Sequence, residues 1–288
     1  MNNKDFNLKS YVQEARSKKV AIGHFNVSNL EMFHGVWNAA SKLKVPVIIG
    51  VSEGERDFMG ITEVISLVRT LREKYNYPIF INADHTYSFE RVKEAIDAGF
   101  DSAIFDGTEL PLEENIATTK KCVEYAKSIN SNILLEAEVG FIGKSSKLLD
   151  KVPDGVGRVT TVEEANDFIN QTKIDMLAPA VGNVHGMVKG GEPKLDTQRI
   201  KEIVDATGVP LVLHGASGNS VEDVKASIEA GISIVHISTE IRVAYIEALK
   251  KSLSDNPKEI APYRYLNPTI EAVEKVVTEK LKLFNNIV

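Results

Sequence analysis

The chain has 288 residues, of which 43% are hydrophobic, and a formal net charge of −6. This length suits one large α/β barrel or two ordinary domains. The negative charge and the lack of a basic stripe exclude a typical nucleic-acid surface, so we expect no nucleic-acid partner. The longest apolar run, residues 45–51, is far too short to span a membrane, and we expect no membrane partner either.

The first residues lack the basic-then-apolar pattern of a signal peptide, which predicts a cytoplasmic protein. The single cysteine, Cys122, excludes an internal disulfide and a thiolate metal cluster. It lies in a predicted helix, where we expect a packing role.

A predicted helix near residues 8–17 precedes a regular alternation of apolar runs and amphipathic segments. The apolar runs predict eight strands, at residues 20–27, 46–52, 79–85, 102–106, 132–139, 175–181, 210–214 and 232–239. A predicted helix follows each strand, at residues 29–43, 61–74, 88–97, 111–129, 161–171, 196–206, 220–229 and 241–252. A Pro-bounded turn and one further helix end the chain.

The sequence also contains an internal repeat. Residues 90–104 are similar to residues 222–235, and in both copies a glycine ends a predicted helix just before a strand. One βα unit used about eight times is typical of a (β/α)8 TIM barrel. We therefore predict an α/β fold in which residues 1–288 form one barrel domain with extra N-terminal and C-terminal helices. A doubly wound open sheet is the alternative.

Two stretches interrupt this alternation. Residues 140–160 follow the fifth strand and are longer than a connection requires, so we expect a mobile lid there. Residues 182–195 follow the sixth strand and are rich in glycine.

Three histidines, His85, His185 and His214, come at or just after the ends of three predicted strands. In a barrel the carboxyl ends of the strands share one mouth, where the chemistry of this fold is found. Neutral imidazoles suit Zn²⁺, and three protein ligands with one open position is the usual catalytic arrangement. A single such histidine is more simply a core or surface residue, but three in equivalent places favour a metal site.

Asp84 precedes one of these histidines on the same strand and so points in a different direction. A bound cation would polarise a carbonyl while this carboxylate moves a proton, so general acid or base catalysis suits Asp84 better than ligation. A structural carboxylate that accepts from a backbone amide is the alternative.

A phosphate site is predicted beside the metal site. Residues 215–218, Gly-Ala-Ser-Gly, follow the seventh strand, and residues 238–239 follow the eighth just before a helix. Barrels often bind a phosphate at this place. Gly186 and Lys189 on the preceding loop would complete the site, although Gly-Ala-Ser-Gly alone is usually only a turn.

Several motifs resemble those of the class II, metal-dependent ketose-bisphosphate aldolases. They are Asp84-His85, Glu136-Ala137-Glu138-Val139-Gly140, Gly182-Asn183-Val184-His185-Gly186, Gly191-Glu192-Pro193-Lys194-Leu195-Asp196, Leu213-His214-Gly215-Ala216-Ser217-Gly218 and Tyr265-Leu266-Asn267-Pro268. The resemblance runs from residue 23 to the terminal helix. It implies a lyase that reversibly splits fructose 1,6-bisphosphate, or tagatose 1,6-bisphosphate, into dihydroxyacetone phosphate and an aldehyde phosphate.

The resemblance also implies roles for individual residues. His85, His185 and His214 would bind one catalytic Zn²⁺, and Asp84 would exchange the proton on the C4 hydroxyl. Asp106 and Glu138 match carboxylates near the metal, which leaves a second divalent or monovalent cation open. The residues that match substrate-contacting or phosphate-binding positions are Asn26, Ser52, Gly186, Lys189, Gly215, Ser217, His236 and Thr239. Enzymes of this type are cytoplasmic homodimers or homotetramers.

The chain also departs from the family pattern. Residues 143–151 lack the lid glutamate that moves a proton of the triose, and His236 stands where the family has asparagine. Thr86 replaces a usual glycine, and Gly190 is an apparent insertion. Two alternatives therefore stay open: an aldolase for a different phosphorylated or sulfonated ketose, and a phosphosugar-binding paralogue with weakened catalysis.

Overall fold

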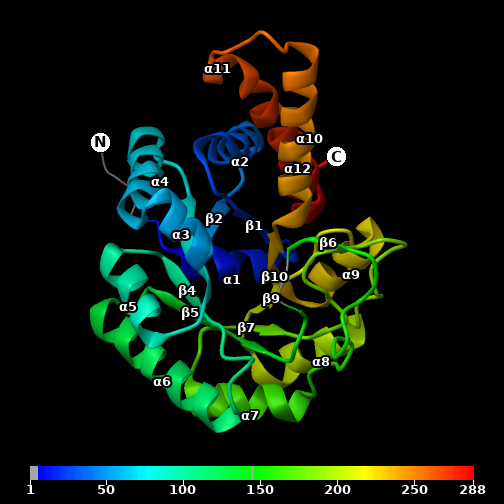
Figure 1. The fold of residues 1–288 in the computed structure, drawn as a ribbon. Coiled ribbons are helices and arrows are strands. Elements are labelled where there is room, and N and C mark those ends of the chain that lie inside the picture. The colour runs from blue at the N-terminus through cyan, green and yellow to red at the C-terminus, as the bar shows by residue number, and fades with distance from the viewer. Residues whose placement is uncertain (1–5, 144–145) are drawn as a thin grey trace.

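The structure, a computed structural model, describes residues 6–143 and 146–288. Eight parallel strands close into a barrel in the order β1-β10-β9-β7-β5-β4-β3-β2 (Figure 1). They are β1 (Ile22–Asn26), β2 (Val47–Val51), β3 (Ile79–Thr86), β4 (Ser102–Phe105), β5 (Leu134–Val139), β7 (Met176–Pro179), β9 (Leu211–Leu213) and β10 (Ile232–Ile237). The predicted TIM barrel is confirmed, and the open sheet is not.

Helices surround the barrel at the predicted places. They are α2 (Leu30–Leu43), α4 (Ile61–Tyr75), α5 (Phe89–Ala98), α6 (Leu112–Ile129), α7 (Val162–Thr172), α8 (Thr197–Thr207), α9 (Val221–Ala230) and α10 (Thr239–Asp255). The additional terminal helices are α1 (Leu8–Lys18), α11 (Pro262–Tyr265) and α12 (Asn267–Phe284). Polar N-caps fix several helix starts, since Asn29, Ser88 and Asp196 each accept a hydrogen bond from a first-turn amide. Within the described chain, no helix combines the length and the apolar character needed to cross a membrane.

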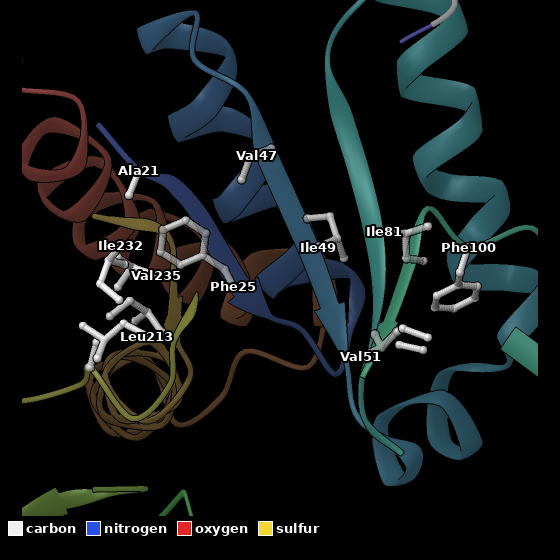
Figure 2. Packing of buried hydrophobic residues seen from close by; sticks show 14 of the residues in the cluster. Ala21, Phe25, Val47, Ile49, Val51, Ile81, Phe100, Leu213, Ile232 and Val235 are labelled. Carbon is white, nitrogen blue, oxygen red and sulfur yellow. The ribbon is translucent and has the colours of Figure 1, made fainter. Parts of the chain in front are cut away.

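The alternation of side chains along the strands separates two cores. Outward-facing residues such as Phe25, Ile49 and Val235 pack between the barrel and its helices (Figure 2). The opposite set fills the barrel and meets Leu8 and Val12 of α1, which closes the N-terminal end. This interior set comprises Ile22, Ile48, Phe80, Leu134, Met176, Ala178, Val212 and Ile234.

Polar side chains take over the barrel interior towards the carboxyl ends of the strands. Because a strand returns to the same face every second residue, Ile22 is followed inside by His24, Phe80 by Asn82, and Val212 by His214. Two residues after Leu134 and Ile234 come Glu136 and His236, which are likewise buried. The barrel interior is thus apolar towards the N-terminal ends of the strands, which we call its floor, and polar at their carboxyl ends, which form its mouth.

Four short elements of the described chain were missing from the sequence prediction, and one of them, α11, lies where a Pro-bounded turn was expected. Helix α3 (Glu53–Met59) lies between β2 and α4, and its few residues are too polar and too short to show an apolar period. The two irregular stretches pair with each other, because β6 (Leu148–Leu149) and β8 (Met187–Val188) form a parallel two-stranded sheet. Residues 144 and 145 of the expected lid lie outside the described residues, and the mobility of the lid stays a prediction.

Cys122 lies on the inner side of α6 and is completely buried. Burial raises the pKa of its thiol to about 12, so the sulfur stays protonated near neutral pH. This environment suits the packing role expected from the sequence.

Candidate metal centre

Four side chains from four parts of the barrel mouth converge on one point. They are His85 of β3, Glu138 of β5, His185 after β7 and His214 after β9, and one ligand atom of each lies within 4.8 Å of those of the others. The ring of His85 lies 4.8 Å from that of His185 and 5.0 Å from that of His214, measured between centroids. The structure therefore brings together the three predicted histidines and adds one of the two predicted carboxylates.

Each of the three imidazoles is oriented by a hydrogen bond on its other nitrogen. His85 Nδ1 lies 3.0 Å from an oxygen of Asp106, and His185 Nδ1 donates to the carbonyl of Gly143 at 2.7 Å. Glu136 Oε1 lies 2.8 Å from Nε2 of His214. These partners leave one nitrogen of each ring free to face the cluster, which is the arrangement that orients histidine ligands of metals.

The donor set fits a divalent cation. His214 Nδ1 and Glu138 Oε2 are buried, lie 3.5 Å apart, and have no hydrogen-bond partner among the described residues. Buried polar atoms are rarely left without a partner. Imidazole nitrogens and a carboxylate oxygen around a shared point are the ligands that Zn²⁺ prefers. Asp106 does not join them, because its carboxylate binds the outer nitrogen of His85.

Protons compete with a cation for this cluster. Burial lowers the pKa of His185 to about 4, so this imidazole is neutral as a ligand must be. Burial also disfavours the charged form of His85, but the carboxylates of Asp84 and Asp106 outweigh it and raise its pKa to about 9. Glu136 and Glu138 likewise outweigh burial and raise the pKa of His214 well above its ordinary value. A cation would displace protons from these two rings.

A bulge in β3 allows Asp84 and His85 to face the same mouth. In a regular strand consecutive side chains point to opposite faces. The register of β3 against β4 shifts between Ala83 and Thr86, and His85 has φ of +35°, which is strained for a residue with a side chain. The bulge thus turns His85 into the mouth beside Asp84.

Asp84 is held as a buried carboxylate. Asn26 Nδ2 donates to its Oδ2 at 2.8 Å, and Oδ1 lies 3.5 Å from His236 Nδ1 and 4.0 Å from His85 Nε2. Burial would raise the pKa of Asp84, but the nearby histidines, His85 first, hold it well below its usual range. The carboxylate is therefore ionised and lies close to the four-residue cluster without belonging to it, and its role in proton transfer stays a prediction.

His236 belongs to a stack of imidazoles in the barrel interior. Its ring lies 3.5 Å from that of His24 at an interplanar angle of 3° and 4.2 Å from that of His214. Burial lowers the pKa of His24 to about 4 and that of His236 well below its ordinary value, so both rings are neutral. The stack needs Gly50 beneath it, because a Cβ at that position would lie 2.0 Å from the ring of His24.

Most of the predicted substrate residues line one cavity beside the cluster. Its lining includes Asn26, Asp84, His85, Ser146, His185, Gly186, Gly215, Ser217, His236, Ser238 and Thr239. Gly215 has φ of +60°, and a Cβ there would lie 2.3 Å from the carbonyl oxygen of Val184, so only glycine fits this approach of two loops.

Two predicted substrate residues lie elsewhere. The side chain of Lys189 is 73% exposed and pairs with Asp150, 2.6 Å away. The hydroxyl of Ser52 donates to Glu55 at the start of α3 instead of facing the cavity.

Sequence reasoning missed several residues that support the site. Glu55 lies on α3, an element that the sequence did not predict, and it accepts hydrogen bonds from the side chains of Asn26, Ser52 and Arg242. Glu136 was part of a quoted motif but received no role, although it stands two residues before Glu138 and therefore shares its face of β5.

A closed parallel (β/α)8 barrel with a cluster of imidazoles and carboxylates at its carboxyl mouth has the architecture of a TIM-barrel enzyme. The chain matches the family model of class-II fructose-bisphosphate aldolase over residues 6–287, and it belongs to this family. It is therefore an aldolase, a lyase, and the resemblance read from its motifs is confirmed.

Relatives and solved structures agree with this assignment. The chain is 39% identical over 280 residues to a fructose-bisphosphate aldolase of Staphylococcus aureus, with 96% of each chain covered. It is 38% identical over 282 residues to a fructose-bisphosphate aldolase of Geobacillus stearothermophilus, which covers 97% of this chain and 96% of the relative. The crystal structure of the YdjI aldolase from Escherichia coli K12 matches with a TM-score of 0.82 at 32% identity over 96% of both chains.

Proposed function

We propose that this protein is a Zn²⁺-dependent aldolase that reversibly cleaves fructose 1,6-bisphosphate, or its tagatose epimer, to dihydroxyacetone phosphate and an aldehyde phosphate. The observation that carries this proposal is the convergence of His85, His185, His214 and Glu138 beside the ionised carboxylate of Asp84. When bound, the cation supplies Lewis-acid polarisation of the substrate carbonyl.

Asp84 is the proton-transfer residue in this proposal. In the cleavage direction its carboxylate takes the proton of the C4 hydroxyl, the C3–C4 bond breaks, and its electron pair moves towards the polarised C2 carbonyl. Asn26 holds one carboxylate oxygen and leaves Oδ1, which is buried without a hydrogen-bond partner among the described residues, for the substrate hydroxyl. The same group returns the proton in the direction of synthesis.

The ketone-side phosphate would bind at the N-terminus of α10. Thr239 begins this helix, and Ser238 Oγ is buried without a hydrogen-bond partner in the described part of the chain. Ser217 and Gly215 line the same cavity, and the hydroxyl of Ser217 accepts from the amide of Glu240 in the first turn of α10 at 3.4 Å. The start of a helix and an unpartnered hydroxyl are suited to a phosphate oxygen. Lys189 lacks such support, because its side chain pairs with Asp150.

A second candidate is an aldolase for a different phosphorylated or sulfonated ketose. Asp150 and Asp154 are acidic residues of the predicted lid, and their side chains are 86% and 96% exposed and pair with lysines. They therefore give no support for a replacement of the missing lid glutamate. The described lining of the cavity also contains no lysine or arginine for a second phosphate, and it includes His236.

Release of triose phosphate from both bisphosphates, with and without a chelator, tests the proposal. We expect Zn²⁺-dependent release from at least one of them. Turnover of neither sugar defeats the substrate assignment, and turnover of other ketose phosphates then supports the second candidate. Proton exchange on dihydroxyacetone phosphate would rule out a protein that only binds phosphosugars. A single domain, a cytoplasmic location and a homodimer or homotetramer stay predictions.

A further inference from the structure

Arg56 of α3 is a fully buried arginine behind the candidate metal centre. Its side chain is 2% exposed. One terminal nitrogen, Nη1, donates to the carbonyl of Val51 at 2.8 Å and to that of Asp84 at 3.4 Å. The other, Nη2, donates to the hydroxyl of Thr86 at 3.2 Å. One guanidinium therefore contacts the residues directly before and after His85.

These contacts span the bulge that presents the site. The hydroxyl of Thr86 accepts from Arg56 and lies 3.5 Å from the carbonyl of Ala83, to which it donates. Ala83 and Thr86 are the two residues between which the register of β3 shifts. The hydrogen bonds of Arg56 and Thr86 form a clamp across the bulge, and His85, with φ of +35°, lies inside it. A strained conformation persists only where its surroundings hold it in place, and here the rigid, planar guanidinium of Arg56 does so.

Burial of the Arg56 guanidinium costs free energy, which suggests a role beyond packing. The hydrogen-bond acceptors of Arg56 within the described chain are two carbonyls and one hydroxyl, all neutral, and its Nε is buried without a described partner. Burial of a cation against neutral partners costs free energy. If packing were the only requirement, a shorter or apolar side chain would fill this position of α3 at a lower cost in free energy.

We propose that Arg56 is a positioning residue that fixes the β3 bulge through Asp84 and Thr86, so that His85 faces the cation. The identity of the cation as the catalytic Zn²⁺ rests on the proposed function. Thr86, the residue that departs from the family glycine, provides the hydroxyl that completes the clamp. Neither residue touches substrate or cation in this assignment, and both act through the backbone that carries His85.

Zn²⁺ affinity, measured by competition with a chromophoric chelator, tests this role independently of turnover. We expect Arg56→Lys and Thr86→Val to weaken Zn²⁺ binding by about 10–100-fold, the usual effect of losing an outer-shell partner of a ligand. Thr86→Ser keeps the hydroxyl and should retain wild-type affinity. The absorption spectrum of bound Co²⁺ should change in the first two variants and not in the third.

Arg72 of α4 offers a matched control, because its side chain also contacts β3. Its guanidinium donates to the carbonyl of Ile79 at 2.8 Å and pairs with Asp101, at the end of β3 away from the site. Arg72→Lys should lower the melting temperature but leave Zn²⁺ affinity within about twofold, since only the opposite end of β3 is affected. Wild-type affinity in Arg56→Lys, or an equal loss in Arg72→Lys, would overturn the inference.

A crystal structure of metal-free Arg56→Lys separates this inference from the proposed function. We expect His85 to leave its positive-φ conformation, and an unchanged bulge would reject the clamp whatever the protein catalyses. Conversely, a wild-type protein that binds Zn²⁺ but cleaves no ketose phosphate would reject the proposed activity and leave the role of Arg56 intact.

Discussion

Glu136 and His214 form a buried pair across the barrel interior, with Oε1 of the carboxylate 2.8 Å from Nε2 of the imidazole. Both side chains are 1% exposed. The pair decides which nitrogen of His214 faces the cluster, since the bonded Nε2 is unavailable and Nδ1 is free. An outer-shell carboxylate that fixes a ligand histidine in this way also makes the imidazole a better donor.

Glu136→Gln should therefore weaken Zn²⁺ binding by about 10–100-fold, because the amide orients the ring less strongly and does not increase its basicity. Competition titration with a chelator measures the change. Asp175→Asn is the control, since Asp175 pairs with Lys127 and accepts from the amide of Leu135 outside the site. Equal affinities for Glu136→Gln and the wild type would show that this pair does not orient the ligand.

Asp84→Asn should lower kcat for ketose bisphosphate cleavage by about 10²–10⁴-fold, the usual effect of losing a general base. Zn²⁺ content should stay near that of the wild type, because Asp84 lies beside the cluster and not in it. Steady-state kinetics and metal analysis measure the two effects. Asp150→Asn and Asp154→Asn should leave kcat unchanged, and a large loss in either would mean that a lid carboxylate reaches the substrate.

The apparent affinity for Zn²⁺ should rise with pH between pH 6 and pH 9. The carboxylates of Asp84 and Asp106 raise the pKa of His85 to about 9, so below that pH a proton occupies the ligand. His214, whose pKa is also raised, binds a second competing proton, and each proton costs about tenfold in affinity for each pH unit below its own pKa. Titrations between pH 6 and pH 9 measure the slope. In Asp106→Asn the pKa of His85 should fall, and the affinity for Zn²⁺ near neutral pH should depend less steeply on pH.

The stability of the metal-free protein should fall with rising pH, whereas its Zn²⁺ affinity should rise. A group whose pKa is raised on folding stabilises the protein fully below its unfolded pKa, which for histidine is about 6.5, and this stabilisation is lost as pH rises through the folded value. Protonated His85 should therefore stabilise the metal-free fold at pH 6 and no longer do so above about pH 9. A melting temperature of the metal-free protein that rises across this window would contradict the pairing of His85 with Asp106.

Gly50→Ala should destabilise the protein by about 1–3 kcal/mol, the usual cost of overpacking a core. The added Cβ would lie 2.0 Å from the ring of His24, which is buried and stacked on His236. Thermal unfolding measures the effect. Gly54→Ala is the matched control, because nothing lies within 4 Å of a Cβ there and the helical residue should gain about 0.5–1 kcal/mol. A neutral Gly50→Ala would mean that the imidazole stack adapts.

Much of this protein could be predicted from local patterns. The period-two apolar runs and the period-3.6 helices correspond to the eight strands and the surrounding helices, and the strand-end positions of His85, His185 and His214 were sufficient to predict their convergence. The two short strands β6 and β8 could not be predicted, because each is only two residues long and is stabilised by its partner. Helix α3 was missed for a similar reason, since it is short and its buried side chains are charged.

The sequence by itself determined the barrel, its apolar floor and the ring of polar residues at its mouth, because alternation along a strand and the parallel order of strands fix these features. Only the tertiary structure decided that His85 turns inward through a strained bulge, that Glu136 and Asp106 orient ligands, and that Arg56 lies buried behind Asp84. These features depend on contacts between residues far apart in the chain, such as Glu136 with His214, and local spacing carries no information about such distances.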